Sequence, residues 1–129
     1  MASDADPTSW LDTWRSRHQI KRSLQGRHDH IAALYRSRLP TFIIIGAAKS
    51  ATTSLATTLG RHPEIQISRS MEPKFFGRHY LRGWQWYASQ FAEDPQRPLR
   101  GEASTMYSSS YGTYDGTPEL IHHHLGPIP

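Results

Sequence analysis

One segment combines a glycine, a lysine and several hydroxyl side chains: Gly46-Ala47-Ala48-Lys49-Ser50-Ala51-Thr52-Thr53-Ser54. An apolar run precedes it, and leucines one helical turn apart follow it, so we expect it to join a buried strand to a helix. Backbone N–H groups at a helix start, together with the helix dipole, bind anions. Lys49 adds a positive charge and the hydroxyls add donors. The pattern therefore indicates a site for an anionic group.

The position of the lysine separates this loop from a common one. The phosphate loop of ordinary ATPases and GTPases reads G-x-x-x-x-G-K followed by Ser or Thr. Here Lys49 comes three residues after Gly46 and three before Thr52, which excludes that pattern. The alternative interpretation is a helix start rich in serine and threonine with an incidental lysine.

A second segment, Met71-Glu72-Pro73-Lys74-Phe75-Phe76, places an acid and a base two residues apart. Pro73 favours an extended conformation for Glu72, and side chains two apart on an extended segment point to the same side. Such a pair suits removal of a proton from a hydroxyl or amine beside developing negative charge. The alternative is an exposed ion pair, which is common and contributes little stability.

Together these segments resemble the sulfotransferases that use 3′-phosphoadenosine 5′-phosphosulfate. The 5′-phosphosulfate loop of that family reads roughly G-x-x-K-[SAC]-[GA]-T-T-[SW]-L, and the loop described above, extended to Leu55, is similar to it. The E-x-x-F-F segment is typical of the heparan-sulfate-type branch, which includes many bacterial members. The resemblance continues through residues 77–87 and 101–107 and covers about Thr41 to Pro129.

The resemblance implies transfer of a sulfuryl group from this donor to a hydroxyl or amine acceptor, with a carbohydrate expected. It implies that residues 46–54 bind the donor, that Lys49 stabilises the leaving phosphate and that Glu72 is the general base. Lys74, Arg78 and His79 are expected on the acceptor side, and no metal is expected. Two other functions stay open: a P-loop nucleotide kinase-like enzyme and a non-catalytic module that binds polyanions.

The elements that must position these residues follow from periodicity and from Gly and Pro. Residues 8–38 predict two helices broken at Gly26. We then expect a strand at Thr41–Ile45 covered on both faces, followed by a helix from about Thr52 with Gly60 at its C′ position. Two further strands are expected at Ile65–Ile67 and Leu99–Ala103, with a helix over residues 83–91 between them. The last predicted element is a helix that has Thr117 as its N-cap and ends at Gly126-Pro127. This order predicts an α/β fold with a P-loop-type parallel sheet flanked by helices.

The domain organisation expected is a basic helical extension at residues 1–40 and the N-terminal half of a sulfotransferase domain at residues 41–129. The family's arginine and serine that bind the donor's 3′-phosphate would follow Pro129, so we expect an incomplete domain. Seven basic residues and one acid lie between Arg15 and Arg38, within a formal net charge of +4. This stretch is the basis of the polyanion-binding alternative, although a solvated helix face is the favoured explanation of it.

Composition bounds the remaining possibilities. The chain has no cysteine, so disulfides and thiolate metal sites are excluded. The longest apolar run, Phe42–Ile45, is too short to cross a bilayer, so we expect a cytoplasmic protein without a membrane span, and no nucleic-acid partner. Three consecutive histidines, His122-His123-His124, point about 100° apart on a helix and cannot converge on one ion, so we interpret them as helix filler.

Overall fold

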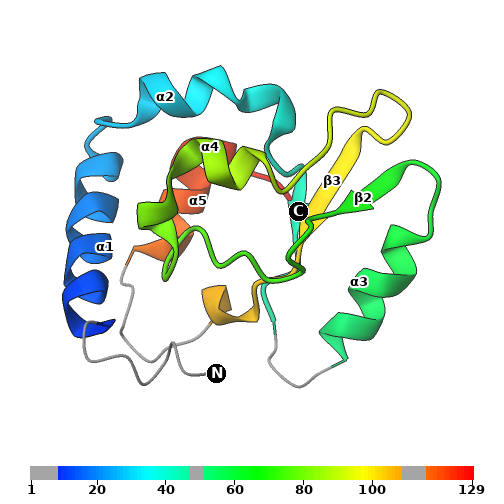
Figure 1. Cartoon of the computed structure of the whole chain (residues 1–129), viewed down its shortest axis with the longest axis horizontal. Coiled ribbons are helices and arrows are strands. Elements are labelled where there is room, and N and C mark those ends of the chain that lie inside the picture. Colours follow the sequence, from blue (N-terminus) through cyan, green and yellow to red (C-terminus); the bar gives the residue numbers. More distant parts are fainter. Residues whose placement is uncertain (1–8, 47–50, 109–115) are drawn as a thin grey trace.

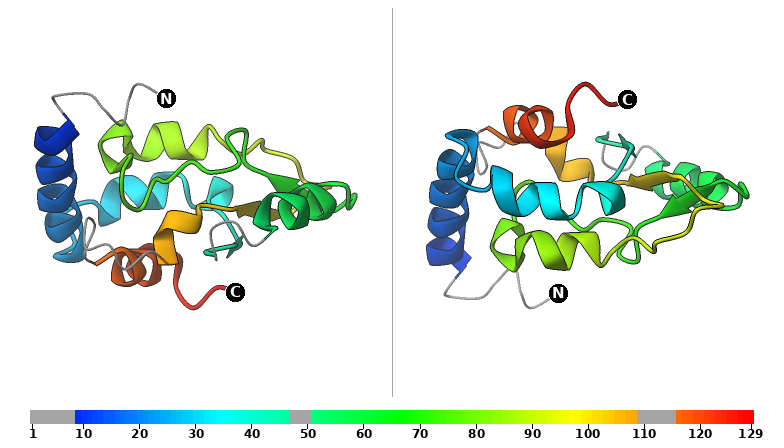
Figure 2. Two further views of the ribbon diagram at one scale, coloured as in Figure 1. Left: turned by 90° about the horizontal axis from the view of Figure 1, so that it is seen from below. Right: turned by 90° about the horizontal axis from the view of Figure 1, so that it is seen from above.

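The computed structural model describes residues 9–46, 51–108 and 116–129, with side chains from Trp14 onward. The described elements are, in chain order, the α-helices and strands with short 3₁₀ helices (η) between them: α1 (Ser9–Leu24), α2 (Asp29–Leu34), η2 (Arg36–Arg38), β1 (Phe42–Ile43), α3 (Thr52–Gly60), β2 (Ile65–Ile67), η3 (Tyr80–Arg82), α4 (Gly83–Ala88), β3 (Leu99–Glu102), η4 (Thr105–Ser108) and α5 (Thr117–Leu125). Figure 1 shows α1 and α3 at opposite ends of the molecule, and Figure 2 shows α4 and α5 on opposite sides of it.

The described strands form one parallel sheet in the order β1-β3-β2. Phe42 pairs with Gly101 in β3, and Ile65 pairs with Leu99 on its other side. Because the strands are parallel, the segments that follow all three begin at the same edge of the sheet. The expected α/β class, a parallel sheet flanked by helices, is confirmed.

The first strand is shorter than predicted. Only Phe42 and Ile43 form β1, although the ladder continues as the amide of Ile44 donates to Glu102 O at 2.9 Å. Ile45 is 50% exposed, so the expectation of a run covered on both faces is wrong for this residue. On the side of β1 away from β3, the amide of Ile43 donates to Pro129 O at 3.1 Å. The end of the described chain therefore returns to the outer edge of β1.

Two helix ends differ from the expectation. Gly60 is the last residue of α3, and Arg61 follows in a right-handed conformation, so no left-handed C′ glycine ends this helix. A Cβ on Gly60 would lie 3.3 Å from Ile67 Cγ1, which explains a small residue there. At α5 the left-handed residue Gly116 precedes the helix, and Thr117 is helical instead of being the N-cap. The Thr117 hydroxyl donates to Phe76 O at 2.8 Å and so ties α5 to the core.

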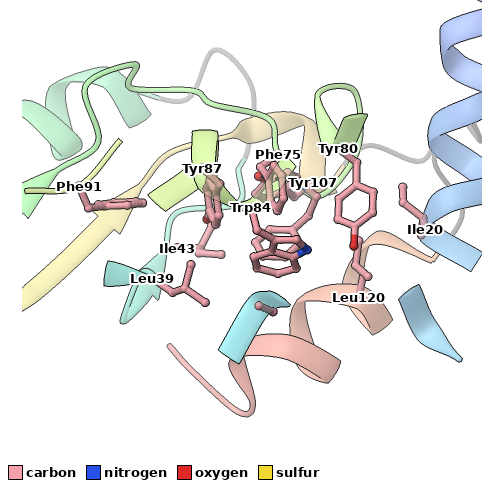
Figure 3. Close-up of a cluster of buried hydrophobic side chains, with 12 residues drawn as sticks. Ile20, Leu39, Ile43, Phe75, Tyr80, Trp84, Tyr87, Phe91, Tyr107 and Leu120 are labelled. Atoms are coloured by element: carbon pink, nitrogen blue, oxygen red, sulfur yellow. Dashed lines mark hydrogen bonds between the residues drawn. The ribbon is translucent and has the colours of Figure 1, made fainter. Parts of the chain in front are cut away.

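The core is built mainly from aromatic side chains that face one another between α1, α4, α5 and the sheet (Figure 3). Phe75 and Tyr87 are fully buried and stack with ring centroids 4.3 Å apart. Trp84 and Tyr87 lie in the core as the helical spacing predicts, and Trp86 is partly buried beside the Arg82 guanidinium. Ile20 of α1 is 1% exposed, so the N-terminal helix shares this core. None of the helices in the described ranges has both the length and the apolarity that crossing a bilayer requires.

Candidate functional site

The turn after β1 packs against the helical turn after β3. Gly46 lies so close to Ser108 that a Cβ added to the glycine would collide with the serine hydroxyl. Ser108 is the last residue of η4, and its hydroxyl donates to Thr105 O at 3.1 Å. A larger side chain at position 46 would therefore have to displace the side chain of Ser108 at the carboxyl edge of the sheet.

The start of α3 has the properties expected of an anion site. Ala51 occupies the N-cap position with φ +64°, and it provides no side-chain hydrogen bond to the helix. The first amides of a helix, here those of Thr52 and Thr53, have no partner within the helix. Thr53 and Ser54 are exposed, and Thr52 is half-buried. Ala47, Ala48, Lys49 and Ser50 lie outside the described residues.

Glu72 lies at the same edge of the sheet. Its Oε1 accepts hydrogen bonds from the Thr105 amide at 3.2 Å and from the Thr105 hydroxyl at 3.1 Å. The segment that carries it runs beside β3, because the amide of Ala103 donates to Met71 O at 2.9 Å. The carboxylate is exposed to solvent, which leaves it accessible to a ligand. Residues 105 and 108 of η4 thus contact both predicted segments, Glu72 through Thr105 and Gly46 through Ser108.

Lys74 departs from the predicted geometry. Its φ is +55°, in the left-handed region, so the segment is not uniformly extended and the argument that Glu72 and Lys74 point the same way is wrong. The Lys74 amide donates to Ser104 Oγ at 2.8 Å, and its carbonyl accepts from the His79 amide at 3.0 Å. These bonds fold the chain back on itself at Lys74. Glu72 and Lys74, both in the described part of the chain, form no ion pair with each other, so the alternative interpretation is not supported.

His79 is fixed by the same turn. Its Nδ1 donates to Pro73 O at 3.0 Å, and its ring meets Trp86 edge to face with centroids 6.1 Å apart. Burial lowers the pKa of His79, and the nearby Arg82, Arg78 and Lys74 lower it further against the opposing hydrogen bond to Pro73. Arg78, like His79, is half-buried. A role for either side chain toward an acceptor remains a prediction.

Sequence reasoning assigned no role to Glu102, the buried last residue of β3, which lies at this edge of the sheet. It is completely buried, and its Oε2 accepts from the hydroxyls of Tyr87 at 2.6 Å and Tyr107 at 3.0 Å. Its Oε1 accepts from Ser104 Oγ at 2.5 Å. Burial raises the pKa of Glu102 to about 7, against the opposing effect of these donors. The signal available in the sequence was an acid near the end of the strand expected at Leu99–Ala103.

A second cluster joins distant parts of the chain. His123 Nε2 lies 2.7 Å from Asp29 Oδ1, and His124 Nε2 lies 2.7 Å from Ser23 Oγ. The interpretation of these two histidines as helix filler is therefore wrong, because it considered them only with each other and with His122.

Comparison with known proteins gives several relatives. The chain is 37% identical over 78 residues to "Membrane-associated sulfotransferase kil1" of Dictyostelium discoideum, covering 58% of this chain and 17% of the relative. It is 36% identical over 87 residues to human "Heparan sulfate glucosamine 3-O-sulfotransferase 6", covering 67% and 24% respectively. A third relative is "Bifunctional heparan sulfate N-deacetylase/N-sulfotransferase 1" of Caenorhabditis briggsae, 38% identical over 65 residues, or 46% of this chain and 8% of that protein. No family model matches the chain.

These relatives correct one expectation. The Dictyostelium discoideum protein is named as membrane-associated, which contradicts the expected cytoplasmic location. The absence of a long apolar run said nothing about association with a membrane by other means.

The names of these relatives agree with the family that the two motifs resemble, although the matches cover only part of each relative. The matches span less than a quarter of the length of each of these relatives. All three relatives are named sulfotransferases, and two are named for heparan sulfate. The resemblance expected from the loop and from the E-P-K-F-F segment is confirmed: in sequence, the chain is a relative of the heparan-sulfate-type sulfotransferases and matches part of their length.

Proposed function

We propose that this chain is the donor-binding and proton-accepting part of a sulfotransferase, which transfers a sulfuryl group from 3′-phosphoadenosine 5′-phosphosulfate to a carbohydrate hydroxyl or amine. The proposal rests on one observation: η4 contacts both the predicted donor-binding loop and the segment that carries the predicted base. Ser108 lies beside Gly46, and the Thr105 hydroxyl donates to Glu72. An anion bound after β1 and a base after β2 would then share one edge of a parallel sheet, the usual ligand position in open α/β sheets.

The donor's 5′-phosphosulfate would bind residues 46–54, which the sequence predicts to form a P-loop-type turn. The first amides of α3, which have no partner within the helix, and the helix dipole favour an anion there. Thr52, Thr53 and Ser54 supply hydroxyl donors. Lys49 enters the proposal from the sequence motif alone, as the cation that balances the charge developing on the leaving phosphate.

Glu72 would act as the general base. The acceptor oxygen or nitrogen attacks sulfur, and the bond from sulfur to the 5′-phosphate oxygen breaks with its electron pair on that oxygen. The acceptor proton moves to Glu72, leaving adenosine 3′,5′-bisphosphate and the sulfated acceptor. Thr105 binds Oε1, so Oε2 is the oxygen we assign to the proton. Positioning of the two reactants supplies the remaining rate enhancement.

The acceptor side is the least constrained. Two relatives are named for heparan sulfate, an anionic polysaccharide, and the cationic Lys74 and Arg78 would suit such an acceptor. His79 is half-buried and would contribute through Nε2, the ring nitrogen that does not bind Pro73 O. Residues 41–129 form the N-terminal part of the domain in this proposal. Residues 1–40 form a basic extension, although its Ile20 packs into the same core.

Calorimetric titration with adenosine 3′,5′-bisphosphate tests the donor site. We expect binding that Lys49→Ala abolishes. Arg61→Ala removes the same charge from the far end of α3 and should leave binding unchanged. Tighter binding of ATP with magnesium would favour the kinase-like alternative. Salt-sensitive heparin binding that does not depend on Lys49, without nucleotide binding, would favour the polyanion-binding module.

A further inference from the structure

Two segments that lie far apart in the sequence bring an acid and two imidazoles together. Asp29 is the first residue of α2, and His123 and His124 lie in the last turn of α5. One potential ligand atom from each of these side chains lies within 4.8 Å of the other two. His122, the preceding residue on the same helix, is not in this group and is exposed. The tertiary fold therefore places two of the three consecutive histidines, His123 and His124, beside Asp29.

The donor set has a definite chemical preference. Two imidazole nitrogens and one carboxylate oxygen suit Zn²⁺ and similar divalent transition metals. At zinc bond lengths, tetrahedral ligand atoms lie roughly 3.3–3.5 Å apart. The hydrogen-bonded atoms of Asp29 and His123, now 2.7 Å apart, must therefore separate, and the wider distances, of at most 4.8 Å, must shorten. The side chains of Asp29 and His123 are 56% and 30% exposed, and solvent-exposed groups can make this adjustment.

The partners of His124 orient its ring. Ser23 Oγ lies 2.7 Å from His124 Nε2, and the Tyr80 hydroxyl donates to Ser23 Oγ at 2.6 Å. His28 Nδ1 lies 2.8 Å from the same tyrosine oxygen. With Nε2 held by Ser23, Nδ1 is the nitrogen left for a metal. A hydrogen bond from the second ring nitrogen is the usual support of a metal-binding histidine.

A pocket of about 150 Å³ opens beside the three side chains, and it is also lined by Ala32, Ala33, Arg36 and Leu39. Three protein ligands next to such a pocket leave room for a fourth ligand. Arg36 carries a positive charge there, which weakens attraction of a cation but favours a small anion in the fourth position. We propose that Asp29, His123 and His124 form a zinc-class metal site that links the start of α2 to the end of α5.

Zinc binding to the whole chain tests this site, measured by competition with a chromophoric chelator. We expect one equivalent of Zn²⁺ to bind, and Asp29→Asn and His123→Ala each to weaken binding by about 10-fold or more. His122→Ala is the matched control, because it removes an exposed imidazole from the same helix, and it should leave the affinity unchanged. Circular dichroism of each variant verifies that it folds.

The unmodified chain gives an independent answer. Ring-nitrogen NMR should show zinc-dependent shifts for His123 and His124 and none for His122, and bound Co²⁺ should show the intense visible absorption of a tetrahedral complex. An equal loss of zinc affinity in His122→Ala and His123→Ala would indicate nonspecific binding by the run of histidines and would overturn the proposal. Full affinity in Asp29→Asn, or the absence of stoichiometric binding, would also overturn it.

Discussion

Glu72 Oε1 accepts two hydrogen bonds from Thr105, one from the amide at 3.2 Å and one from the hydroxyl at 3.1 Å. These bonds hold a solvent-exposed carboxylate in one orientation. Without them, an exposed glutamate would sample several rotamers. If Glu72 is the base, its function depends on a residue that follows β3 and is distant in sequence.

Replacement of the base should separate chemistry from binding. In a chain extended to the full length of the domain, Glu72→Gln keeps the size of the side chain but cannot accept the proton, so the sulfuryl transfer rate should fall by about 10²- to 10⁴-fold. Binding of adenosine 3′,5′-bisphosphate should stay unchanged. Transfer of labelled sulfuryl and calorimetric titration measure the two effects. An unchanged transfer rate in this variant would remove Glu72 from the mechanism.

Loss of the Thr105 hydroxyl should have a smaller effect on the same step. Thr105→Val keeps the shape and the backbone amide, so we expect about a 10-fold lower rate, as is typical when a supporting hydrogen bond is removed. Thr105→Ser retains the hydroxyl and should restore most of the activity. Equal rates for the valine and serine variants would show that the hydroxyl does not position the base.

The left-handed conformation of Ala51 predicts a stabilising substitution. Its φ is +64°, which costs a residue with a Cβ roughly 1–2 kcal/mol but costs glycine little. Ala51→Gly should therefore raise the free energy of unfolding by about 0.5–1 kcal/mol, measured by urea denaturation. Ala56→Gly, within the same helix, should lower it by about 1 kcal/mol. Two changes of the same sign would contradict the assigned backbone geometry.

The close packing of Gly101 and Phe42 predicts a severe effect in the sheet. A Cβ at position 101 would overlap the Phe42 ring, so Gly101→Ala should destabilise the fold by about 1–3 kcal/mol. In the double variant with Phe42→Ala the clash is gone, and the cost of Gly101→Ala should nearly vanish. Denaturation of the two single variants and the double variant measures this coupling. Additive losses would exclude a direct overlap.

The buried Glu102 predicts a pH dependence of stability. Its pKa is raised from the ordinary value of 4.5 to about 7 in the folded protein, which therefore holds this proton more tightly than the unfolded chain does. Stability from this group is fully present below about pH 4.5 and is lost as the pH rises through 7, by up to about 3 kcal/mol. Glu102→Gln cannot ionise and should flatten this part of the profile. A fall of equal size in the variant would assign it to other groups.

The sequence predicts the helices and strands well, because their apolar periods and their Gly and Pro signals are local. The helix predicted over residues 83–91 ends earlier, at Ala88, but Tyr87 and Phe91 are both fully buried, as the apolar spacing predicts. Boundaries such as that at Ile45 were missed because exposure depends on what lies across the sheet.

The contacts at the candidate sites are not local, and the sequence could not supply them. Glu72 binds Thr105, and Asp29 meets His123 across nearly the whole described chain. Lys74 has a left-handed conformation, and its amide donates to Ser104 Oγ, which is distant in the sequence. Motif spacing predicted which residues would carry the chemistry, while the contacts of those residues required the fold.

The strand order has a kinetic consequence. β3 lies between β1 and β2, and Phe42 pairs with Gly101 while Ile65 pairs with Leu99. The β1–β3 pairing closes a much longer loop of chain than the β2–β3 pairing, and longer closure costs more entropy. β1 is therefore expected to join last during folding. The turn at Gly46 would then acquire its shape only after the rest of the sheet, so partly folded molecules would lack donor affinity.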